Sequence, residues 1–231
     1  MEDGEIARFE NVSKIYHQGK IQVAALKDFS FKMKKGDFTV VSGPSGSGKT
    51  TLLNVLGALD VPTSGAVYLE GRNLSALDRT ELSRIRRDRI GFVFQAYNLI
   101  PVLTAYENAE FVMAIQGVPR KERRQRVMAI LKDIGLEGLE DRRPDELSGG
   151  QQQRVAIARA IVTNPVVVLA DEPTANLDSH TADSLLEIME VLNHQKGITF
   201  LFSTHDPRVM ERAHRIIRLT DGMLMSDEEQ P

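Results

Sequence analysis

The chain has 231 residues, of which 42% are hydrophobic and 26% are charged, a composition typical of a globular protein with one large domain or two tightly joined lobes. It contains no cysteine, which excludes disulfides, thiol catalysis and a cysteine-ligated metal site. The formal net charge of -3 gives no overall reason to expect a nucleic-acid partner, and we expect none.

The first ten residues, MEDGEIARFE, are acidic and contain no apolar run, so we expect no signal peptide. The longest apolar stretch, VVVLA at 166–170, is far shorter than a membrane span. Together with the absence of cysteine, these features favour a protein of the cytoplasm. If the protein works at a membrane, we expect another chain to supply the spans.

Alternating apolar residues predict strands near the start of the chain. Phe29, Phe31 and Met33 alternate with other side chains, and FTVVSG at 38–43 is a second apolar run. The polar segment KKGD at 34–37 is the predicted turn between them. The start of the chain is therefore predicted to be rich in β-structure.

A glycine loop, GPSGSGKT at 43–50, follows this strand. Leu52, Val55, Leu56 and Leu59 then recur at helical spacing, so the loop fits the pattern G-x-x-x-x-G-K-[ST] between a strand and a helix, and this context disfavours a loop that merely caps a helix. Backbone N–H groups of such a loop surround a β-phosphate, while the lysine reaches the β and γ oxygens and the threonine hydroxyl meets Mg2+. We expect the following residues to bind the phosphates of a nucleotide: Gly43, Pro44, Ser45, Gly46, Ser47, Gly48, Lys49, Thr50 and Thr51.

Two basic runs, RIRRDR at 84–89 and RKERRQR at 120–126, raise the question of a nucleic-acid or lipid surface. Acidic residues interrupt both runs and no aromatic residues are interleaved, so we interpret them as solvated helix faces.

The middle of the chain is predicted to be helical. Val127, Ile130, Leu131 and Ile134 recur at helical spacing, and the alternation of β-branched residues disappears. We expect a single domain over 1–231, with a nucleotide-binding core at about 1–95 and 161–231 and a helical subdomain at about 96–160.

A second glycine turn, LSGGQQQR at 147–154, also opens a helix. Ser148 is expected to cap that helix, with Gln151 at the matching capping-box position. Gly149 and Gly150 also bring bare backbone N–H groups to a helix N-terminus, where an anion is favoured. We call each of these glycine turns, 43–50 and 147–154, a phosphate cradle. One phosphate cradle is sufficient to bind a nucleotide, so the second one requires an explanation.

The apolar run VVVLADEP at 166–173 ends in two acids. As a buried strand of a parallel sheet it would place Asp171 and Glu172 at the carboxyl edge, where such sheets bind ligands. We expect Asp171 to hold Mg2+ and Glu172 to polarise the attacking water. A pair of acids at a helix start, before Pro173 and Thr174, is the alternative.

A further apolar run, ITFLFST at 198–204, is predicted to be another strand of this parallel sheet, and SDEEQP at 226–231 is predicted to be frayed. The predicted crossover helix between the two strands has the apolar face Leu185, Ile188, Met189 and Leu192.

These motifs occur in a characteristic order: GPSGSGKT, Gln95 in GFVFQ, LSGGQQQR, VVVLADEP, ANLD at 175–178 and STHD at 203–206. The set resembles the nucleotide-binding subunit of an ATP-binding cassette (ABC) transporter over nearly the whole chain, and LSGGQ separates this family from other P-loop ATPases. The resemblance implies an α/β fold, in which a P-loop core with a parallel sheet carries an N-terminal antiparallel β subdomain and a helical subdomain. It also implies hydrolysis of Mg-ATP to ADP and phosphate.

The resemblance accounts for the second cradle. In this family two subunits meet head to tail, and the signature turn of one closes over the γ-phosphate bound by the other, which makes a homodimer the expected active form. Asp178 is expected to cross the dimer interface. The signature residues expected to act in trans are Ser148, Gly149, Gly150 and Gln151.

The family also assigns roles to single positions. Gln95 is expected to contact the metal, with Thr50 and Asp171, or the lytic water, and to report the nucleotide state to the helical subdomain. His205 contacts the γ-phosphate and holds Glu172, so that Lys49, Glu172 and His205 form the catalytic set; without the family, a lone histidine would be interpreted as structural. Tyr16, expected on the loop after the first strand, stacks on adenine, and its alternative is a tyrosine packed on the surface.

Longer segments indicate a branch of the family. VLGALDVPTSGAVYLEGR and STHDPRVMERAHRIIRLTDGMLMSDE are similar to the lipoprotein-release (LolD-like) and macrolide-exporter (MacB-like) ATPases, a group that includes a cell-division ATPase. Such members work with integral membrane permeases that have few spans and a large extracytoplasmic domain. We expect the protein to lie at the cytoplasmic face of the inner (plasma) membrane, bound peripherally through this partner. The cargo of the complex is expected to be amphiphilic.

We expect Tyr97, Leu99 and Ile100 in AYNLIP to be exposed and to contact that partner; for all three the alternative is burial in the core of the helical subdomain.

Three alternatives stay open at this point. A polar amino-acid importer ATPase shares LSGGQQQRVAIARA. A soluble ABC ATPase of a cytoplasmic assembly, such as iron-sulfur cluster scaffolding, would have soluble partners. A regulatory module that binds ATP without turnover is disfavoured because Glu172 and His205 are present.

Overall fold

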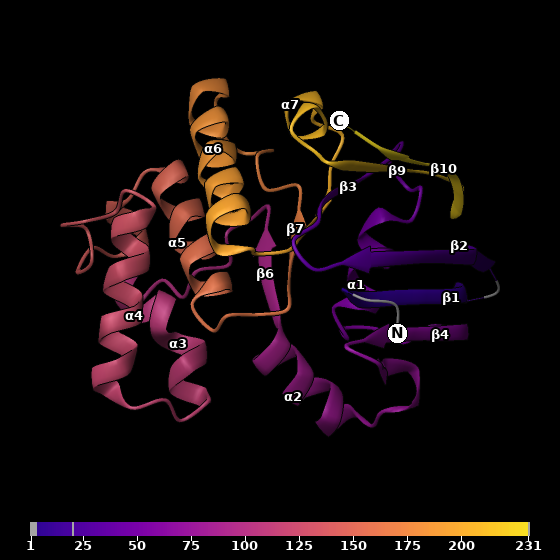
Figure 1. The fold of residues 1–231 in the computed structure, drawn as a ribbon, viewed down its shortest axis with the longest axis horizontal. Helices are drawn as coiled ribbons and strands as arrows, with labels where there is room; N and C mark the ends of the chain where they lie inside the picture. The colour runs from indigo at the N-terminus through magenta and orange to yellow at the C-terminus, as the bar shows by residue number, and fades with distance from the viewer. Residues whose placement is uncertain (1–3, 20, 231) are drawn as a thin grey trace.

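The computed structural model describes residues 4–19 and 21–230. Its strands form two sheets, and in Figure 1 the helices α3, α4 and α5 lie on one side of the molecule while the antiparallel sheet lies on the other. The antiparallel sheet has the order β2-β1-β4-β5. Its strands are β1 (Glu5–Gln18), β2 (Ile21–Lys34), β4 (Ser64–Leu69) and β5 (Arg72–Asn73).

The second sheet has the order β10-β9-β3-β8-β7-β6. All neighbouring pairs in it are parallel except β10 with β9. Its strands are β3 (Phe38–Ser42), β6 (Ile90–Phe94), β7 (Val167–Asp171), β8 (Phe200–Ser203), β9 (Arg215–Thr220) and β10 (Met223–Glu229).

The α-helices are α1 (Lys49–Leu56), α2 (Arg79–Arg89), α3 (Ala105–Ile115), α4 (Arg120–Asp133), α5 (Gly149–Ile161), α6 (Ser179–Lys196) and α7 (Pro207–Glu211). Two short 3-10 helices are Leu74–Ala76 and Pro144–Glu146.

The parallel sheet is buried on both faces, which explains its nearly continuous apolar strands. Neighbouring residues of β3 alternate between two apolar clusters: Val40 packs with the helices α3 to α6, whereas Val41 packs with α1 and the antiparallel sheet. The helix α5 approaches β6 closely, because a Cβ at Gly91 would lie 2.4 Å from the carbonyl oxygen of Ala160. The predicted α/β fold class is therefore confirmed.

The helical middle of the chain consists of α3, α4 and α5, which pack on one another (Figure 1). Val127 and Leu131 lie buried on α4, and Ile134 caps its end, as their spacing predicts. The helix α6 connects β7 to β8 as the predicted crossover, with Leu185, Met189 and Leu192 buried. The division into a core and a helical subdomain at 96–160 stays a prediction.

The polar segment KKGD forms the predicted turn between two strands, although these strands, β2 and β3, belong to different sheets. Two local expectations are wrong. Leu59 lies beyond the end of α1 and is 50% exposed, since the helix stops at Gly57. The segment 226–229 is not frayed: it continues β10, where Asp227 forms an ion pair with Arg215 at 2.6 Å. Pro231, at the end of that prediction, lies outside the described residues.

Within the described part of the chain, no helix combines the length and the apolar character that crossing a membrane requires.

Candidate functional site

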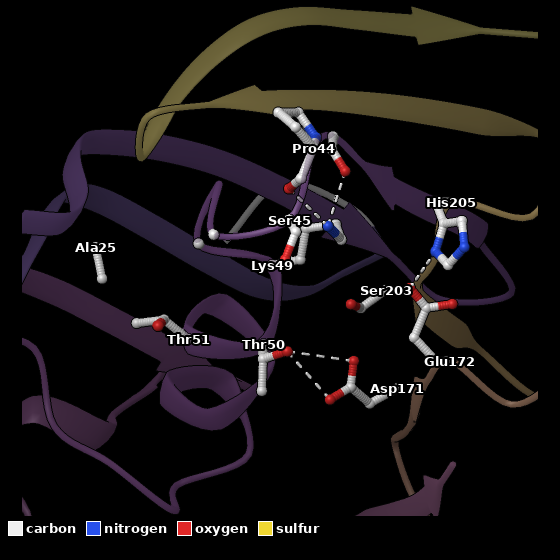
Figure 2. A pocket seen from close by; sticks show the side chains of 13 residues that line it. Ala25, Pro44, Ser45, Lys49, Thr50, Thr51, Asp171, Glu172, Ser203 and His205 are labelled. Atoms are coloured by element: carbon white, nitrogen blue, oxygen red, sulfur yellow. Dashed lines mark hydrogen bonds and ion pairs between the residues drawn. The ribbon is translucent and has the colours of Figure 1, made fainter. Parts of the chain in front are cut away.

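A cavity of about 580 Å³ opens at the carboxyl ends of the central parallel strands (Figure 2). The loop from β3 to α1 forms one wall, and the residues that follow β7 and β8 form the other. The lining residues are Ala25, Gly43, Pro44, Ser45, Gly46, Gly48, Lys49, Thr50, Thr51, Asp171, Glu172, Ser203 and His205. The structure thus brings together the glycine loop, the two acids and the histidine, which lie more than 150 residues apart at their extremes.

Two glycines of the loop are required by close backbone approach. Gly43 has φ 155°, and a Cβ there would lie 2.1 Å from the carbonyl oxygen of Leu219. Gly48, the N-cap of α1, has φ 104°, and its Cβ would lie 2.2 Å from the carbonyl oxygen of Ala25. Side chains avoid this left-handed region and have no space here, so the sequence must place glycine at both positions.

The ammonium group of Lys49 lies within the loop. Its Nζ donates to the carbonyl oxygens of Gly43 at 2.8 Å and Pro44 at 3.0 Å (Figure 2). These contacts hold the positive charge beside the N-terminus of α1, where the helix dipole also favours an anion. A bound phosphate can replace these carbonyl oxygens as the acceptor of the ammonium N–H groups. The exchange is favourable because a charged acceptor makes a stronger hydrogen bond than a neutral one.

A hydroxyl and a carboxylate face each other across the cavity. Thr50 Oγ1 donates to Asp171 Oδ2 at 3.2 Å (Figure 2). These two oxygen ligands fit Mg2+, which is usually bound by one or two carboxylates together with substrate phosphates and water. The described residues contain no group of three or more histidine, cysteine, aspartate or glutamate side chains that could hold a metal ion. A metal bound here would therefore need ligands from phosphate and water as well. When bound, Mg2+ would neutralise charge on the phosphate oxygens.

Gln95, the third expected metal contact, does not line the cavity. Its Nε2 lies 3.4 Å from Oδ1 of Asn176, and Asn176 Nδ2 donates to the Gln95 carbonyl oxygen at 2.9 Å. The two bonds tie Gln95 to the segment that precedes Asp178. Its role toward Mg2+ stays a prediction.

Glu172 is held by both of its carboxylate oxygens. Thr204 Oγ1 donates to Oε2 at 2.9 Å, and Nδ1 of His205 lies 2.8 Å from Oε1. The backbone of Glu172 has φ 46°, a left-handed conformation that costs free energy in a non-glycine residue. The acid pair does not start a helix, because α6 begins at Ser179 with Asp178 as its N-cap. That alternative is therefore wrong.

Ser203 and Thr204 are site residues that the motif analysis did not assign. Ser203 lines the cavity, and its buried hydroxyl has no hydrogen-bond partner among the described residues. Both residues belong to STHD, so the signal was present in the sequence next to His205.

Tyr16 lies within β1 and not on a loop, which corrects its expected position. The strand runs through several irregularities of register and reaches Gln18. The hydroxyl of Tyr16 donates to Asp60 Oδ2 at 2.8 Å. The pKa of this hydroxyl is raised, mainly because the group is partly buried. A hydrogen bond with Thr51 acts to lower the pKa, and the Asp60 carboxylate acts to raise it. Through Thr51 the tyrosine lies next to the cavity without lining it.

The signature turn is capped as expected. Ser148 Oγ accepts from the Gln151 backbone N at 3.3 Å, and Gln151 Oε1 accepts from the Ser148 backbone N at 2.9 Å. Gly150 lies against α6, where a Cβ would lie 2.2 Å from Cγ2 of Thr181. None of the described signature residues lines the cavity of its own chain. The turn therefore lies outside the cavity that the glycine loop forms, and its action in trans stays a prediction.

Asp178 caps α6 in this structure. Its carboxylate accepts from the Thr181 backbone N at 3.0 Å and from Thr181 Oγ1 at 2.6 Å, and these bonds lower the pKa of Asp178. The contact leaves the expected role of Asp178 at a dimer interface untested.

The expected partner contacts are less exposed than predicted. Tyr97, Leu99 and Ile100 are half-buried, and Leu99 packs against the core. Arg159 of α5 donates to the carbonyl oxygens of Tyr97 at 2.9 Å and Asn98 at 2.6 Å, so the loop is held down on the helix that the signature opens. Exposed apolar side chains that follow in the sequence are Val102 at 72% and, on α3, Phe111 at 39% and Ile115 at 55%.

Comparison with known proteins gives a consistent result. A family model described as ABC transporter matches residues 26–175. The chain is 45% identical over 226 residues to an uncharacterized ABC transporter ATP-binding protein of Thermotoga maritima, across 98% of this chain and 96% of that protein. It is 44% identical over 227 residues to the macrolide export ATP-binding/permease protein MacB of Brucella melitensis, across 98% of this chain but 35% of that protein.

Among solved structures, the chain is similar to the ATP-binding cassette MJ0796 of Methanocaldococcus jannaschii, in a dimeric post-hydrolysis state bound to ADP and Pi. The TM-score is 0.89 at 45% sequence identity, and the match covers 97% of this chain and 98% of that one.

Proposed function

This chain belongs to the ABC transporter family and is an ATP-hydrolysing subunit of a transport complex, and we propose that it drives a membrane permease that extracts or exports an amphiphilic cargo. ATP and Mg2+ are its substrate and metal. We assign the phosphate cradle to residues 43–51 and the metal contacts to Thr50 and Asp171, with Gln95 joining when nucleotide is present.

The observation that carries the catalytic assignment is the position of Glu172. Its carboxylate is oriented by Thr204 and His205 and lies on the same cavity as Lys49 and Asp171. In phosphoryl transfer the protein mainly positions groups and stabilises charge, so a fixed carboxylate serves to orient the attacking water. Lys49 neutralises charge on the phosphoryl group, and His205 supports Glu172.

We propose that the active form is a head-to-tail dimer. The signature turn lies outside the cavity of its own chain, and its helix N-terminus with two glycines suits a γ-phosphate bound by a second copy. A relative of 45% identity, MJ0796, is a dimer in its solved structure. A single copy then binds ATP but lacks the groups that complete the site.

The membrane partner is proposed to contact the loop 96–102 and α3. Val102 on this loop and Phe111 and Ile115 on α3 are exposed apolar side chains, and Tyr97, Leu99 and Ile100 are half-buried. An amphipathic helix of a permease binds through apolar side chains of this kind. The MacB relatives combine ATP-binding and permease functions by name, which supports a permease partner. We propose in addition that this permease has few spans and a large extracytoplasmic domain, and that it binds the chain at the cytoplasmic face of the plasma membrane.

The test is affinity purification of tagged Glu172→Gln protein from solubilised native membranes with Mg-ATP, followed by mass spectrometry and by phosphate-release assays of the wild-type complex. An integral membrane protein with few spans supports the proposal. A permease with many spans would favour an amino-acid importer, and soluble companions alone would favour a cytoplasmic scaffold. A wild-type complex that releases no phosphate would contradict hydrolysis-driven transport.

A further inference from the structure

Asp60 lies four residues beyond the end of α1 and accepts hydrogen bonds from three groups. Lys14 Nζ donates to Oδ1 at 2.6 Å, the Tyr16 hydroxyl donates to Oδ2 at 2.8 Å, and the backbone N of Val61 donates to Oδ1 at 2.8 Å. Lys14 Nζ also donates to the carbonyl oxygen of Val61 at 2.8 Å. The phosphate cradle uses none of these contacts, so their effect lies elsewhere.

The same lysine covers one face of the tyrosine ring. Lys14 and Tyr16 are two residues apart on β1, where the register shifts between Lys14 and Ile15, so the contact between their side chains is established by distance and not by spacing. The Lys14 Nζ lies 4.9 Å from the centroid of the Tyr16 ring, a distance that gives a cation–π contact. The ring is thus held at its hydroxyl by Asp60 and on one face by Lys14, so stacking of a flat ligand would use the opposite face.

Asp60 itself is fixed to the helix that begins with the phosphate cradle. The backbone N groups of Leu59 and Asp60 both donate to the carbonyl oxygen of Asn54, at 2.9 Å and 3.1 Å, which folds this segment back on the last turn of α1. The side chain of Lys14 is only 11% exposed and that of Asp60 26%, so the ion pair is shielded and holds its geometry better than a surface pair does. The helix α1 therefore supports the phosphate cradle at one end and, through Asp60, the tyrosine ring.

The charges that this arrangement needs are stable at neutral pH. Partial burial acts to raise the pKa of Asp60, but the bonds from Lys14, Tyr16 and Val61 outweigh it and hold the pKa below its ordinary value. The carboxylate is therefore ionised, and the Tyr16 hydroxyl, whose pKa is raised by burial, is the donor.

We propose that Asp60 and Lys14 are positioning residues that hold the Tyr16 ring for stacking on the base of the nucleotide. The inference deepens the proposed function and depends on it. Stacking on an aromatic ring is tolerant of base identity because every base has a π-face. The two residues therefore contribute affinity for nucleoside triphosphates in general and make no distinction between adenine and guanine.

The test compares a ligand that has a base with one that lacks it. The Mg2+ complexes of ATP and inorganic triphosphate are titrated against the wild type, Asp60→Asn, Lys14→Met and Lys14→Arg, with the steady-state KM and kcat of the complex measured in parallel. Asp133→Asn, which loses an ion pair with Lys196 on the helical side of the molecule, is the matched control. The second variant, Lys14→Met, keeps the test usable if Asp60→Asn does not fold.

We expect Asp60→Asn and Lys14→Met to weaken ATP binding and to raise KM about three- to tenfold, with inorganic triphosphate binding and kcat at saturation unchanged within about twofold. Lys14→Arg, which keeps the cation, restores most of the affinity. Equal weakening of ATP and triphosphate binding would overturn the inference, because the two residues would then only support the fold. Unchanged affinity for ATP in the variants would also overturn it. If the wild type bound neither ligand, the proposed function itself would fail.

Discussion

The Nδ1 atom of His205 lies 2.8 Å from Oε1 of Glu172, and the contact joins the ends of two neighbouring parallel strands, β7 and β8. The two side chains differ sharply in exposure, at 78% for the histidine and 19% for the carboxylate. The exposed histidine can therefore meet an incoming phosphate while it holds the shielded carboxylate. This relation underlies the first two predictions.

Glu172→Gln should bind Mg-ATP but turn it over at least about 100-fold more slowly, because the amide keeps the size of the side chain and loses the base. With hydrolysis blocked, ATP should hold two copies together. Equilibrium sedimentation with and without Mg-ATP measures this dimer, and phosphate release measures the loss of turnover. A variant that stays monomeric at saturating ATP would contradict the composite site. Glu110→Gln, at a partly buried ion pair with Arg123, is the control for a lost carboxylate elsewhere.

His205→Ala should also lower kcat, by about tenfold or more, since Glu172 loses one of its two orienting partners. Combined with Glu172→Gln, it should cause little further loss, because residues that act as a unit are not additive. A double-mutant cycle on kcat measures the coupling. Fully additive losses would show that the histidine acts independently of Glu172.

Lys49→Ala should weaken ATP binding at least about tenfold, because it removes a charge-assisted contact with the phosphates. Among the described residues the same ammonium donates to the loop carbonyl oxygens of Gly43 and Pro44, so the melting temperature without nucleotide should change little. Isothermal titration and thermal melting separate the two effects, with Lys196→Ala as a surface control. Wild-type affinity in Lys49→Ala would contradict the assignment of the cradle.

Gly48→Ala and Gly46→Ala should differ in stability even though both glycines have positive φ. A Cβ at Gly48 meets a backbone oxygen at 2.2 Å, whereas one at Gly46 has nothing within 4 Å. We expect a loss of about 3 kcal/mol or more in unfolding free energy at Gly48, and about 1 kcal/mol at Gly46. Urea unfolding of both variants gives the comparison. Similar losses would mean that strain in φ alone, and not the contact with β2, determines the cost.

Ser148→Arg should leave ATP binding by a single copy nearly intact and abolish turnover, since the bulky charge blocks a site completed by the partner. It also removes a helix cap, at a cost of about 1 kcal/mol. Thr104→Ala removes the same kind of cap from α3 and is the matched control: it should lose similar stability and keep its turnover. Parallel loss of binding and turnover in Ser148→Arg would place the serine in its own chain's site.

Part of the site could be predicted from the sequence because its chemistry depends on short segments. The glycine loop needs backbone freedom at Gly43 and Gly48, and the signature turn needs a cap at Ser148 with Gln151 three residues later. Both requirements are met within a few residues, so they are visible as motifs. The family resemblance then added His205, which spacing alone would have left as a structural residue.

Other features depend on contacts between distant segments and have no local signal. The bonds from Lys14 and Tyr16 to Asp60 join positions more than 40 residues apart, and nothing near Asp60 indicates them. Tyr97 looks like an exposed aromatic residue in sequence, but Arg159 holds its backbone against α5. The segment 226–229 looks like a polar tail, yet pairing with β9 makes it a strand.

The sequence by itself determined the phosphate cradle, the acid pair, the signature turn and the α/β fold class, because periodicity, turn chemistry and motif spacing are properties of neighbouring residues. Only the tertiary structure decided which of the named side chains share one cavity, that the signature turn lies outside it, and that Asp60 anchors the tyrosine. Those outcomes depend on how β-strands from different parts of the chain align, and strand pairing is set by packing across the whole fold.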